Sequence, residues 1–188
     1  LKFLFCSSMY ISRRALRLQF DPRLCPRETY LLCELQWGKS GRFWKHWVRN
    51  DSDDRSHAEK YFLEKIFEPR NYSFCDITLY LSWSPCWSCC NLIRDFLERN
   101  PNVNIDIRVA RLYYVDDPRN RRGLRELHSL EGVTIDVMEA EGKVSHYIYC
   151  WETFIQGGVN YDFQPAKFQS AIQRTRSTLR DILDVSTL

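Results

Sequence analysis

Residues 75–99 have the sequence CDITLYLSWSPCWSCCNLIRDFLER, which contains a clear transition from a strand to a helix. Residues 75–83 are nearly all apolar or β-branched, as in a buried strand. Proline is favoured at the first position of a helix, so Pro85 is expected to open a helix at residues 85–99. The expected buried face of this helix consists of Leu92, Ile93, Phe96 and Leu97.

Alternating and helical patterns predict the other elements on both sides of this unit. Strands are expected at residues 28–37, 42–49, 103–112 and 133–138. Helices are expected at residues 12–20, 56–67, 118–130, 143–155 and 165–185. The last three strands alternate with helices, which favours parallel pairing through right-handed crossovers, whereas residues 38–41 form a hairpin turn between the first two strands. The sequence therefore predicts one α/β domain over residues 1–188, a three-layer α-β-α sandwich with a mixed five-stranded sheet.

The composition restricts the class of protein. The 188 residues carry a net charge of +3, which permits a polyanionic partner without requiring one. No apolar run approaches about 18 residues, so we expect no membrane span. Of the eight cysteines, Cys33 and Cys75 lie in apolar strand patterns and are expected in the core. Such cysteines in a chain of this size fit a reduced intracellular compartment, the cytoplasm or the nucleus.

Two short motifs bring metal-binding side chains together. His57-Ala58-Glu59 supplies an imidazole and a carboxylate, and Pro85-Cys86-Trp87-Ser88-Cys89 supplies two thiols. Cys86 and Cys89 are three positions apart and share one face of their helix. We expect the positive ends of two helices to meet here and to favour the thiolate forms. Three ligands and an open fourth position are typical of catalytic zinc, so one Zn²⁺ is expected on His57, Cys86 and Cys89.

Alternatives remain for the cysteines. Cys90 is four positions from Cys86 and shares its helix face nearly as well as Cys89 does, so Cys90 can replace Cys89 as a ligand. If Cys90 bound in addition, the site would be a closed structural zinc site. A lone Cys-x-x-Cys pair also occurs in redox proteins, where it follows the first strand of a thioredoxin-like unit.

Glu59 is the candidate catalytic residue. The pattern His-x-Glu…Pro-Cys-x-x-Cys is the signature of zinc-dependent nucleobase deaminases, which replace an amino group of a base. In that chemistry the metal lowers the pKa of its bound water to about 7, and Glu59 would pass the water proton to the ring nitrogen and assist the loss of ammonia. Ser56-x-x-Glu59 is also a capping-box pattern, in which Glu59 would only cap its helix.

The motifs His-Ala-Glu and Ser-Trp-Ser-Pro-Cys-Trp-Ser-Cys resemble those of the AID/APOBEC family of polynucleotide cytidine deaminases. The resemblance covers most of the chain and includes Arg27-Glu28-Thr29-Tyr30, Ala110-Arg111-Leu112-Tyr113 and Tyr149-Cys150-Trp151. The chain looks closest to activation-induced deaminase and to the apolipoprotein B mRNA editing branch, which residues 33–38 resemble. The resemblance implies a cytidine-deaminase-like fold and zinc-dependent conversion of cytosine to uracil in single-stranded DNA or RNA.

The resemblance also implies a cytosine pocket formed by Thr29, Asn50, Trp83, Ser84 and Tyr113. Independent support is strongest for Tyr113, which follows a strand where ligands bind in open α/β sheets and whose ring can stack on a base. The alternatives are core packing for the two aromatic residues, a turn role for Asn50 and helix capping by Ser84.

A deaminase of this kind needs a base that is single-stranded or extruded from a duplex. Basic residues near the expected mouth of the pocket are candidates for phosphate contacts, and the alternative for each is a solvated charged face. These candidates are Arg27, Arg49, Arg55, Arg119, Arg121 and Arg122. The resemblance further implies that the loop from Tyr113 to Arg119 selects the base on the 5′ side of the target.

Three functions compete. The favoured one is a zinc-dependent cytidine deaminase that acts on single-stranded nucleic acid. The alternatives are a catalytically inert, zinc-stabilised nucleic-acid-binding protein of the same fold and a deaminase of free nucleosides. The intact Glu59 argues against the inert protein. The Ser-Trp-Ser context and the Tyr113 loop argue against a free nucleoside as substrate.

Overall fold

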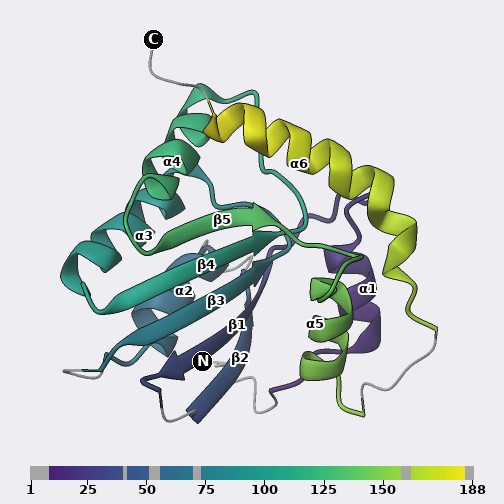
Figure 1. Cartoon of the computed structure of the whole chain (residues 1–188), viewed down its shortest axis with the longest axis horizontal. Helices are drawn as coiled ribbons and strands as arrows, with labels where there is room; N and C mark the ends of the chain where they lie inside the picture. Colours follow the sequence, from purple (N-terminus) through teal and green to yellow (C-terminus); the bar gives the residue numbers. More distant parts are fainter. Residues whose placement is uncertain (1–8, 40–41, 51–55, 70–72, 158–161, 185–188) are drawn as a thin grey trace.

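The computed structural model describes residues 9–39, 42–50, 56–69, 73–157 and 162–184. Its centre is a five-stranded sheet in the order β2-β1-β3-β4-β5 (Figure 1). The strands are β1 (Tyr30–Trp37), β2 (Arg42–Arg49), β3 (Cys75–Leu81), β4 (Val103–Val109) and β5 (Val133–Val137). β1 pairs antiparallel with β2 and with β3, while β4 pairs parallel with β3 and with β5. The predicted mixed sheet is confirmed.

The strand register brings several chain segments to one end of the sheet. Leu81 ends β3 and pairs with Leu31 near the start of β1 and with Val109 at the end of β4. Tyr30 begins β1 and pairs with Arg49 at the end of β2. The segments that precede β1 and that follow β2, β3 and β4 therefore meet at this end. These segments contain all five residues predicted to form the pocket.

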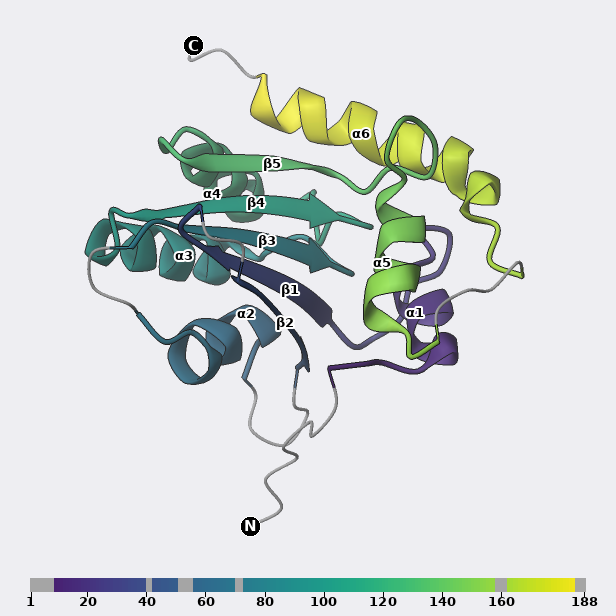
Figure 2. The ribbon, with the colours of Figure 1, turned by 60° about the horizontal axis from the view of Figure 1, so that its bottom comes forward.

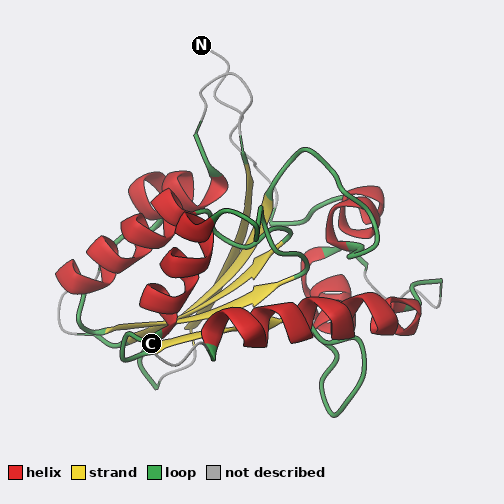
Figure 3. Cartoon of the chain, turned by 90° about the horizontal axis from the view of Figure 1, so that it is seen from above, coloured by secondary structure: helices red, strands yellow, loops and turns green. Residues whose placement is uncertain are grey.

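Helices cover both faces of the sheet and produce the predicted three layers (Figures 2 and 3). They are α1 (Arg13–Phe20), α2 (Ala58–Tyr61), α3 (Trp87–Arg99), α4 (Pro118–His128), α5 (His146–Phe154) and α6 (Gln169–Leu183). α2, α3 and α4 lie on one face, α1 and α5 lie on the other, and α6 runs along β5. A π-helix, η1 (Phe62–Ile66), continues α2, and a 3₁₀-helix, η2 (Pro165–Phe168), precedes α6.

One part of the core lies between the sheet and the layer formed by α2, α3 and α4. On β3 its members are Cys75, Ile77, Leu79 and Leu81, each at most 1% exposed. Trp37 of β1 stacks on Phe67 with ring centroids 5.7 Å apart, and Phe67 meets Phe96 of α3 edge to face at 4.9 Å. Burial of each such large apolar side chain contributes roughly 1.5–3 kcal/mol. This packing holds α3, which follows β3 in the chain, against the sheet.

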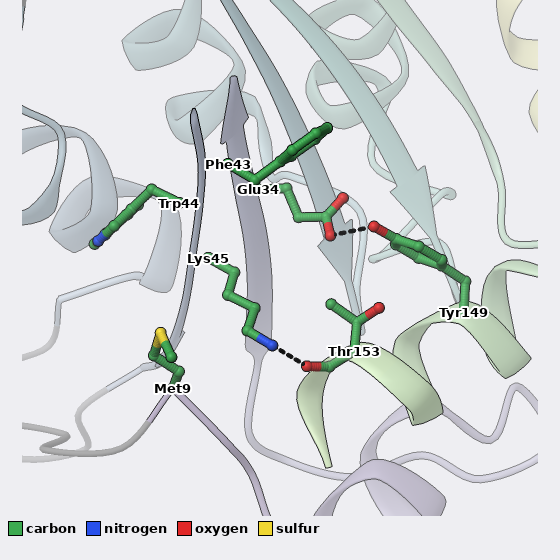
Figure 4. Close-up of a pocket in the computed structure, with 7 residues that line it drawn as sticks. All are labelled: Met9, Glu34, Phe43, Trp44, Lys45, Tyr149 and Thr153. Carbon is green, nitrogen blue, oxygen red and sulfur yellow. Dashed lines mark hydrogen bonds between the residues drawn. The ribbon is translucent and has the colours of Figure 1, made fainter. Parts of the chain in front are cut away.

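A hollow lies on the opposite face of the sheet, between β1, β2 and α5 (Figure 4). The Tyr149 hydroxyl donates a hydrogen bond to Glu34 at 2.5 Å, and Lys45 donates from Nζ to the Thr153 carbonyl at 2.6 Å. Burial raises the pKa of Glu34. Because α5 engages both charged residues of the hollow, these contacts dock α5 onto the sheet.

Several helices begin later than predicted, and at two of them the N-cap explains the shift. The helix expected from Pro85 begins at Trp87, because the backbone of Cys86 is extended at the N-cap with ψ of 169°. The helix expected from residue 143 begins at His146, because the Ser145 hydroxyl caps it there by accepting the N–H of Ile148 at 3.2 Å. Sequence patterns locate a helix well, whereas the cap geometry decides its first residue.

Other element boundaries also differ from those predicted. The helix predicted at residues 56–67 begins at Ala58 and changes to π geometry, with the Phe67 N–H bonded to the Phe62 carbonyl at 2.9 Å. β1 begins at Tyr30, so Thr29 is a loop residue and not the strand residue that we predicted.

Cys33 and Cys75 are both 0% exposed, as predicted for core residues. The seven cysteines in the described part of the chain form no disulfide. Among the described residues, no helix combines the length and the apolar character that crossing a bilayer requires.

Candidate active site

His57, Cys86 and Cys89 lie together where two helices begin. His57 precedes α2, Cys86 precedes α3, and Cys89 lies in the first turn of α3. One potential ligand atom from each residue lies within 4.8 Å of the other two. The Nδ1 atom of His57 is 3.2 Å from the Cys89 sulfur and 3.5 Å from the Cys86 sulfur. The structure thus brings together the three residues that the motif spacing selected as metal ligands.

The helix ends explain how these side chains are aimed. His57 and Cys86 occupy N-cap positions and not the first helical turns in which we predicted them. An N-cap side chain usually accepts an N–H bond from its own helix, but neither residue makes such a bond. Both side chains approach each other instead. The N–H groups and dipoles of the two helices leave positive potential here, which favours the thiolate form of cysteine.

The structure distinguishes Cys89 from Cys90. Cys90 is 2% exposed, and its thiol donates toward the Pro85 carbonyl at 3.7 Å. Its side chain lies under α4, where a Cβ added at Gly123 would be 3.2 Å from the Cys90 Cβ. The group of potential ligand atoms contains Cys89 and not Cys90. Cys90 therefore completes no four-residue metal site with the other three side chains.

The donor set fits a zinc ion. Tetrahedral bonds of about 2.1 Å to nitrogen and about 2.3 Å to sulfur separate the two ligand atoms by about 3.6 Å. The Cys86 sulfur, 3.5 Å from Nδ1 of His57, is close to this separation, and the Cys89 sulfur at 3.2 Å is slightly nearer. A hydrogen bond from Cys89 lowers the pKa of Cys86 to about 4, and the same bond together with burial raises the pKa of Cys89. A divalent cation between the sulfurs would displace the shared proton and allow both to act as thiolates.

Glu59 lies in α2, two residues after His57, and is only 4% exposed. Burial raises the pKa of Glu59, and the negative charge of Cys86 raises it further. The capping-box alternative does not occur, because the N-cap is His57 and not Ser56. A buried carboxyl with raised proton affinity, next to three potential metal ligands, is suited to accept and return a proton.

The two serines of Ser-Trp-Ser hold neighbouring segments in place. The Ser84 hydroxyl accepts the backbone N–H of Tyr113 at 2.8 Å, and the Ser82 hydroxyl accepts that of Tyr30 at 2.8 Å. Ser84 therefore does not cap α3, which was the alternative for this residue. Ser82 received no role from sequence reasoning, because its partner at Tyr30 is remote in the chain. Both serines are buried, at 3% and 0% exposure for Ser84 and Ser82.

Trp83 and Tyr113 form an aromatic corner close to the ligand group. Their ring centroids are 6.3 Å apart in an edge-to-face arrangement. The Trp83 indole N–H donates to the Pro26 carbonyl at 3.1 Å. Burial raises the pKa of Tyr113, with smaller effects from Tyr114 and from the nearby cysteine sulfurs. Because Tyr113 is 37% exposed, its ring is available for stacking and is not a core residue.

Arg111 supports this corner from behind. It is 4% exposed, and its guanidinium lies 4.6 Å from the centre of the Trp83 ring. It donates hydrogen bonds to the backbone carbonyls of Gln19 and Asp21 at the end of α1. Burial lowers the pKa of Arg111 to about 10. Sequence reasoning assigned Arg111 no role, and its only signal was its place in the Ala-Arg-Leu-Tyr stretch.

Thr29 and Asn50 pair at the ends of β1 and β2. The Asn50 N–H donates to the Thr29 carbonyl at 3.0 Å, and the Thr29 N–H donates to the Asn50 side-chain oxygen at 2.9 Å. Both residues are half-buried. The Asn50 side-chain oxygen therefore bonds a residue 21 positions away in the chain and not the backbone of a local turn, which was the alternative for Asn50. The pair holds the two strand ends together beside the other predicted pocket residues.

The arginines predicted to contact phosphate differ in their surroundings. Three are close to carboxylates: Arg49 to Glu28 at 3.7 Å, Arg119 to Asp117 at 2.8 Å and Arg122 to Glu126 at 3.6 Å. Arg119 also lies 5.5 Å from the ring centre of Trp87, at the start of α3. Arg27 is exposed and Arg121 half-buried, while Arg55 lies outside the described residues. Exposed ion pairs are weak, so phosphate groups can compete for these arginines.

The sequence of the chain is similar to that of a known enzyme family. A sequence model of APOBEC4-like AID/APOBEC deaminases matches residues 19–157, which include every predicted ligand and pocket residue. The chain is 45% identical over 139 residues to C->U-editing enzyme APOBEC-1 of Mus musculus, with 72% of this chain and 57% of the relative covered. It is 42% identical over 139 residues to the enzymes of that name from Homo sapiens and Pongo pygmaeus, with 72% of this chain and 56% of each relative covered.

The chain spans little more than half the length of these relatives. The matched region extends from the end of α1 to beyond α5, and it includes all five strands. The fold, the ligand group and the sequence match agree: the chain belongs to the AID/APOBEC deaminase family.

Proposed function

We propose that the chain catalyses the zinc-dependent hydrolytic deamination of cytosine to uracil in single-stranded DNA or RNA. The observation that carries the proposal is the buried carboxyl of Glu59 beside His57, Cys86 and Cys89. The relatives are named C->U-editing enzymes, which supports this reaction type. Because the chain covers 56–57% of their length, the activity of the whole protein is part of the proposal.

In the proposed reaction, water adds to C4 of cytosine and the exocyclic amino group leaves as ammonia. A zinc ion held by His57, Cys86 and Cys89 would supply a Lewis acid that lowers the pKa of water to about 7. Glu59 accepts a proton from the attacking water and delivers it to N3 of the base. Glu59 then carries the second water proton to the departing amino group, so that cytosine and water give uracil and ammonia and the carboxylate is regenerated.

The aromatic corner would hold the base during this reaction. Tyr113 is exposed enough to stack on a cytosine ring, and Trp83 fixes the position of Tyr113 from the side. Thr29, Asn50 and Ser84 would complete the pocket, because they lie at the same end of the sheet. A cytosine inside a duplex cannot enter such a pocket, so the substrate is a single strand or an extruded base.

The phosphate backbone would be bound by the arginines around this sheet end. Arg27 lies in the segment before β1, and Arg49 is the last residue of β2. Arg119 lies beside the start of α3. Phosphate contacts of this kind supply affinity that falls as salt concentration rises. We therefore expect oligonucleotide binding, and with it kcat/KM at low substrate, to weaken as salt is increased.

The direct test is conversion of cytosine to uracil in an oligonucleotide with one cytosine, supplied as matched DNA and RNA strands. Glu59→Gln removes the carboxylate with little change in shape, and it should abolish turnover while the zinc content stays at that of the wild type. Glu98→Gln is the matched control, because Glu98 is an exposed residue of α3, and this variant should keep full activity. Turnover by the Glu59→Gln protein would contradict the assigned role.

The same assay separates the two other functions. An inert nucleic-acid-binding protein would bind zinc and the oligonucleotide but produce no uracil with any variant. A deaminase of free nucleosides would convert free cytidine at least as efficiently as the oligonucleotide. The proposal requires the opposite ranking, because the aromatic and basic residues around the site would otherwise have no ligand.

A further inference from the structure

Asn120, in the first turn of α4, uses both ends of its side-chain amide at the candidate active site. It is 3% exposed, which is unusual for an asparagine. Its Oδ1 atom accepts the backbone N–H of Trp87 at 2.8 Å. Its Nδ2 atom donates to the backbone carbonyl of Tyr114 at 3.1 Å and to that of Tyr113 at 3.4 Å. One buried side chain therefore joins the start of α3 to the loop that carries the two tyrosines.

The acceptor end of this amide replaces a missing helix cap. Trp87 is the first residue of α3, and its N–H has no partner within the helix. Cys86 stands at the N-cap but makes no side-chain capping bond, and its sulfur lies 3.1 Å from the Ser88 hydroxyl and 3.5 Å from Nδ1 of His57. Asn120 accepts this N–H from a neighbouring helix. The bond holds the turn that contains both sulfur ligands without using either sulfur.

The donor end holds a strained piece of backbone. Tyr114 has a φ of +38°, and it is the one non-glycine residue with positive φ in the described part of the chain. Such a conformation persists only where the surrounding structure holds it. The Tyr114 carbonyl accepts from Asn120 and also from the Asp117 N–H at 3.0 Å. In this conformation the Tyr114 ring meets the Tyr113 ring edge to face at 4.6 Å.

We propose that Asn120 is a positioning residue that fixes the Tyr113–Tyr114 backbone relative to the metal-ligand turn of α3. The inference rests on the proposed function, because it assigns Tyr113 to the base pocket. Ser84 holds the Tyr113 N–H from β3, and Asn120 holds the carbonyls of the same two tyrosines from α4. The distance between the stacking ring and the ligand group is thereby set from both sides of the loop.

Two substitutions separate the two ends of the amide. Asn120→Asp keeps an acceptor for the Trp87 N–H at the positive end of α3, but it replaces the donor by an oxygen that repels the two carbonyls. It should release the loop, raise KM for the oligonucleotide up to about tenfold, as expected for loss of one or two hydrogen bonds, and leave zinc content unchanged. Asn120→Ala removes both ends and should in addition loosen the start of α3.

Hydrogen exchange provides a readout that does not depend on turnover. In Asn120→Asp, the amides of residues 113–117 should exchange about tenfold faster than in the wild type, while those of residues 89–93 stay unchanged. Asn100→Asp is the matched control, because Asn100 donates from Nδ2 to the Phe96 carbonyl at 2.8 Å at the other end of α3. This control should leave both KM and the exchange of the tyrosine loop as in the wild type.

Two results would overturn the inference. One is unchanged exchange of residues 113–117 in both Asn120 variants. The other is a fall in kcat and zinc content at constant KM in Asn120→Asp, because Asn120 would then support only the metal-binding turn. Failure of the proposed function has a different signature, since the wild-type protein itself would then form no uracil while the exchange data would still report on the loop.

Discussion

The Ser84 hydroxyl accepts the backbone N–H of Tyr113 at 2.8 Å, although the two residues are 29 positions apart. Ser84 follows β3 and Tyr113 follows β4, and the parallel pairing of these strands is what brings the two together. Trp83 lies between Ser84 and Ser82, and the Ser82 hydroxyl accepts the backbone N–H of Tyr30 at the start of β1. The two serines of the Ser-Trp-Ser motif therefore link the end of β3 to the start of β1 and to the segment after β4, on either side of the Trp83 indole ring.

Replacing Ser84 by Ala should weaken both the fold and substrate binding. The Tyr113 N–H would lose its partner in a partly buried position, at a cost of about 1 kcal/mol in the free energy of unfolding. The loop that carries the Tyr113 ring would then be held only from its carbonyl side, so KM for the oligonucleotide should rise more than kcat falls. Thermal unfolding and steady-state kinetics measure the two effects.

Ser129→Ala is the control for this prediction. The Ser129 hydroxyl also makes one backbone hydrogen bond, to the Glu126 carbonyl at 2.7 Å, but it is exposed at the end of α4. Its loss should change the free energy of unfolding by less than about 0.5 kcal/mol. An equal increase in KM for the two alanine variants would show that the Ser84 contact has no specific effect on the pocket.

Cys89 and Cys90 should respond differently to substitution. Cys89→Ala removes one of the three ligands and should lower the bound zinc, measured by elemental analysis, well below one ion per chain. Cys90→Ala should keep the zinc content of the wild type and cost about 1 kcal/mol in unfolding free energy, because it leaves a small void under α4. Loss of zinc in the Cys90 variant, with retention in the Cys89 variant, would reverse the assignment.

This pair of cysteines illustrates what a sequence pattern can predict at a site. The motif spacing selected His57 and Cys86 together with a second sulfur, and the structure places all of these side chains at one point. Spacing alone did not separate Cys89 from Cys90, because positions three and four residues apart share a helix face. The two cysteines are distinguished by α4, because Gly123 of this helix lies directly over Cys90. The sequence does not reveal that Gly123 and Cys90 are in contact.

The sequence predicted the arrangement of helices and strands correctly, but it did not predict the buried polar contacts that support the site. Strand alternation and the order of helices are local properties, and they gave the mixed sheet with its parallel half. Three buried polar residues received no role in the prediction: Ser82, Arg111 and Asn120. The residues that they bond, which are Tyr30, Gln19 and Trp87 respectively, lie 33 to 92 positions away in the chain. Buried polar residues of this kind are recognised only when the acceptor or donor that each one satisfies is known.

Arg111→Lys should destabilise the corner that contains Trp83. The guanidinium donates to two backbone carbonyls and stacks on the indole, whereas an ammonium has neither the planar face nor the fixed pair of donors. We expect a loss of about 2–3 kcal/mol in the free energy of unfolding, together with a higher KM for the oligonucleotide. Chemical denaturation and kinetics on the same preparation measure both quantities.

Arg125→Lys provides the comparison. Arg125 also donates to a backbone carbonyl, that of Ile182 at 3.4 Å, but this contact joins α4 to α6 away from the site. The comparison variant should leave KM unchanged and have a smaller effect on stability. If both lysine variants raised KM equally, the change would reflect general loosening of the fold and not the support of Trp83.

His146 should make the fold sensitive to mild acid. Burial lowers the pKa of His146 in the folded protein, and the positive charge of Arg108 adds to this effect. Its Nδ1 atom accepts the N–H of Glu139 at 2.9 Å, which requires that this nitrogen carry no proton. The structure thus favours the neutral ring, whereas the unfolded chain has an ordinary histidine pKa of about 6.5.

The sign of the pH dependence follows from this difference. As pH falls below about 6.5, the unfolded chain binds a proton that the folded protein does not yet accept, so the free energy of unfolding decreases until the pH reaches the folded-state pKa. His46, whose pKa burial also lowers, acts in the same direction. His146→Gln retains an acceptor for the Glu139 N–H but does not titrate, so its stability should fall less than that of the wild type between pH 7 and pH 5. Chemical denaturation of both proteins at each pH measures this difference, and parallel curves would show that His146 has the same proton affinity in the folded and unfolded states.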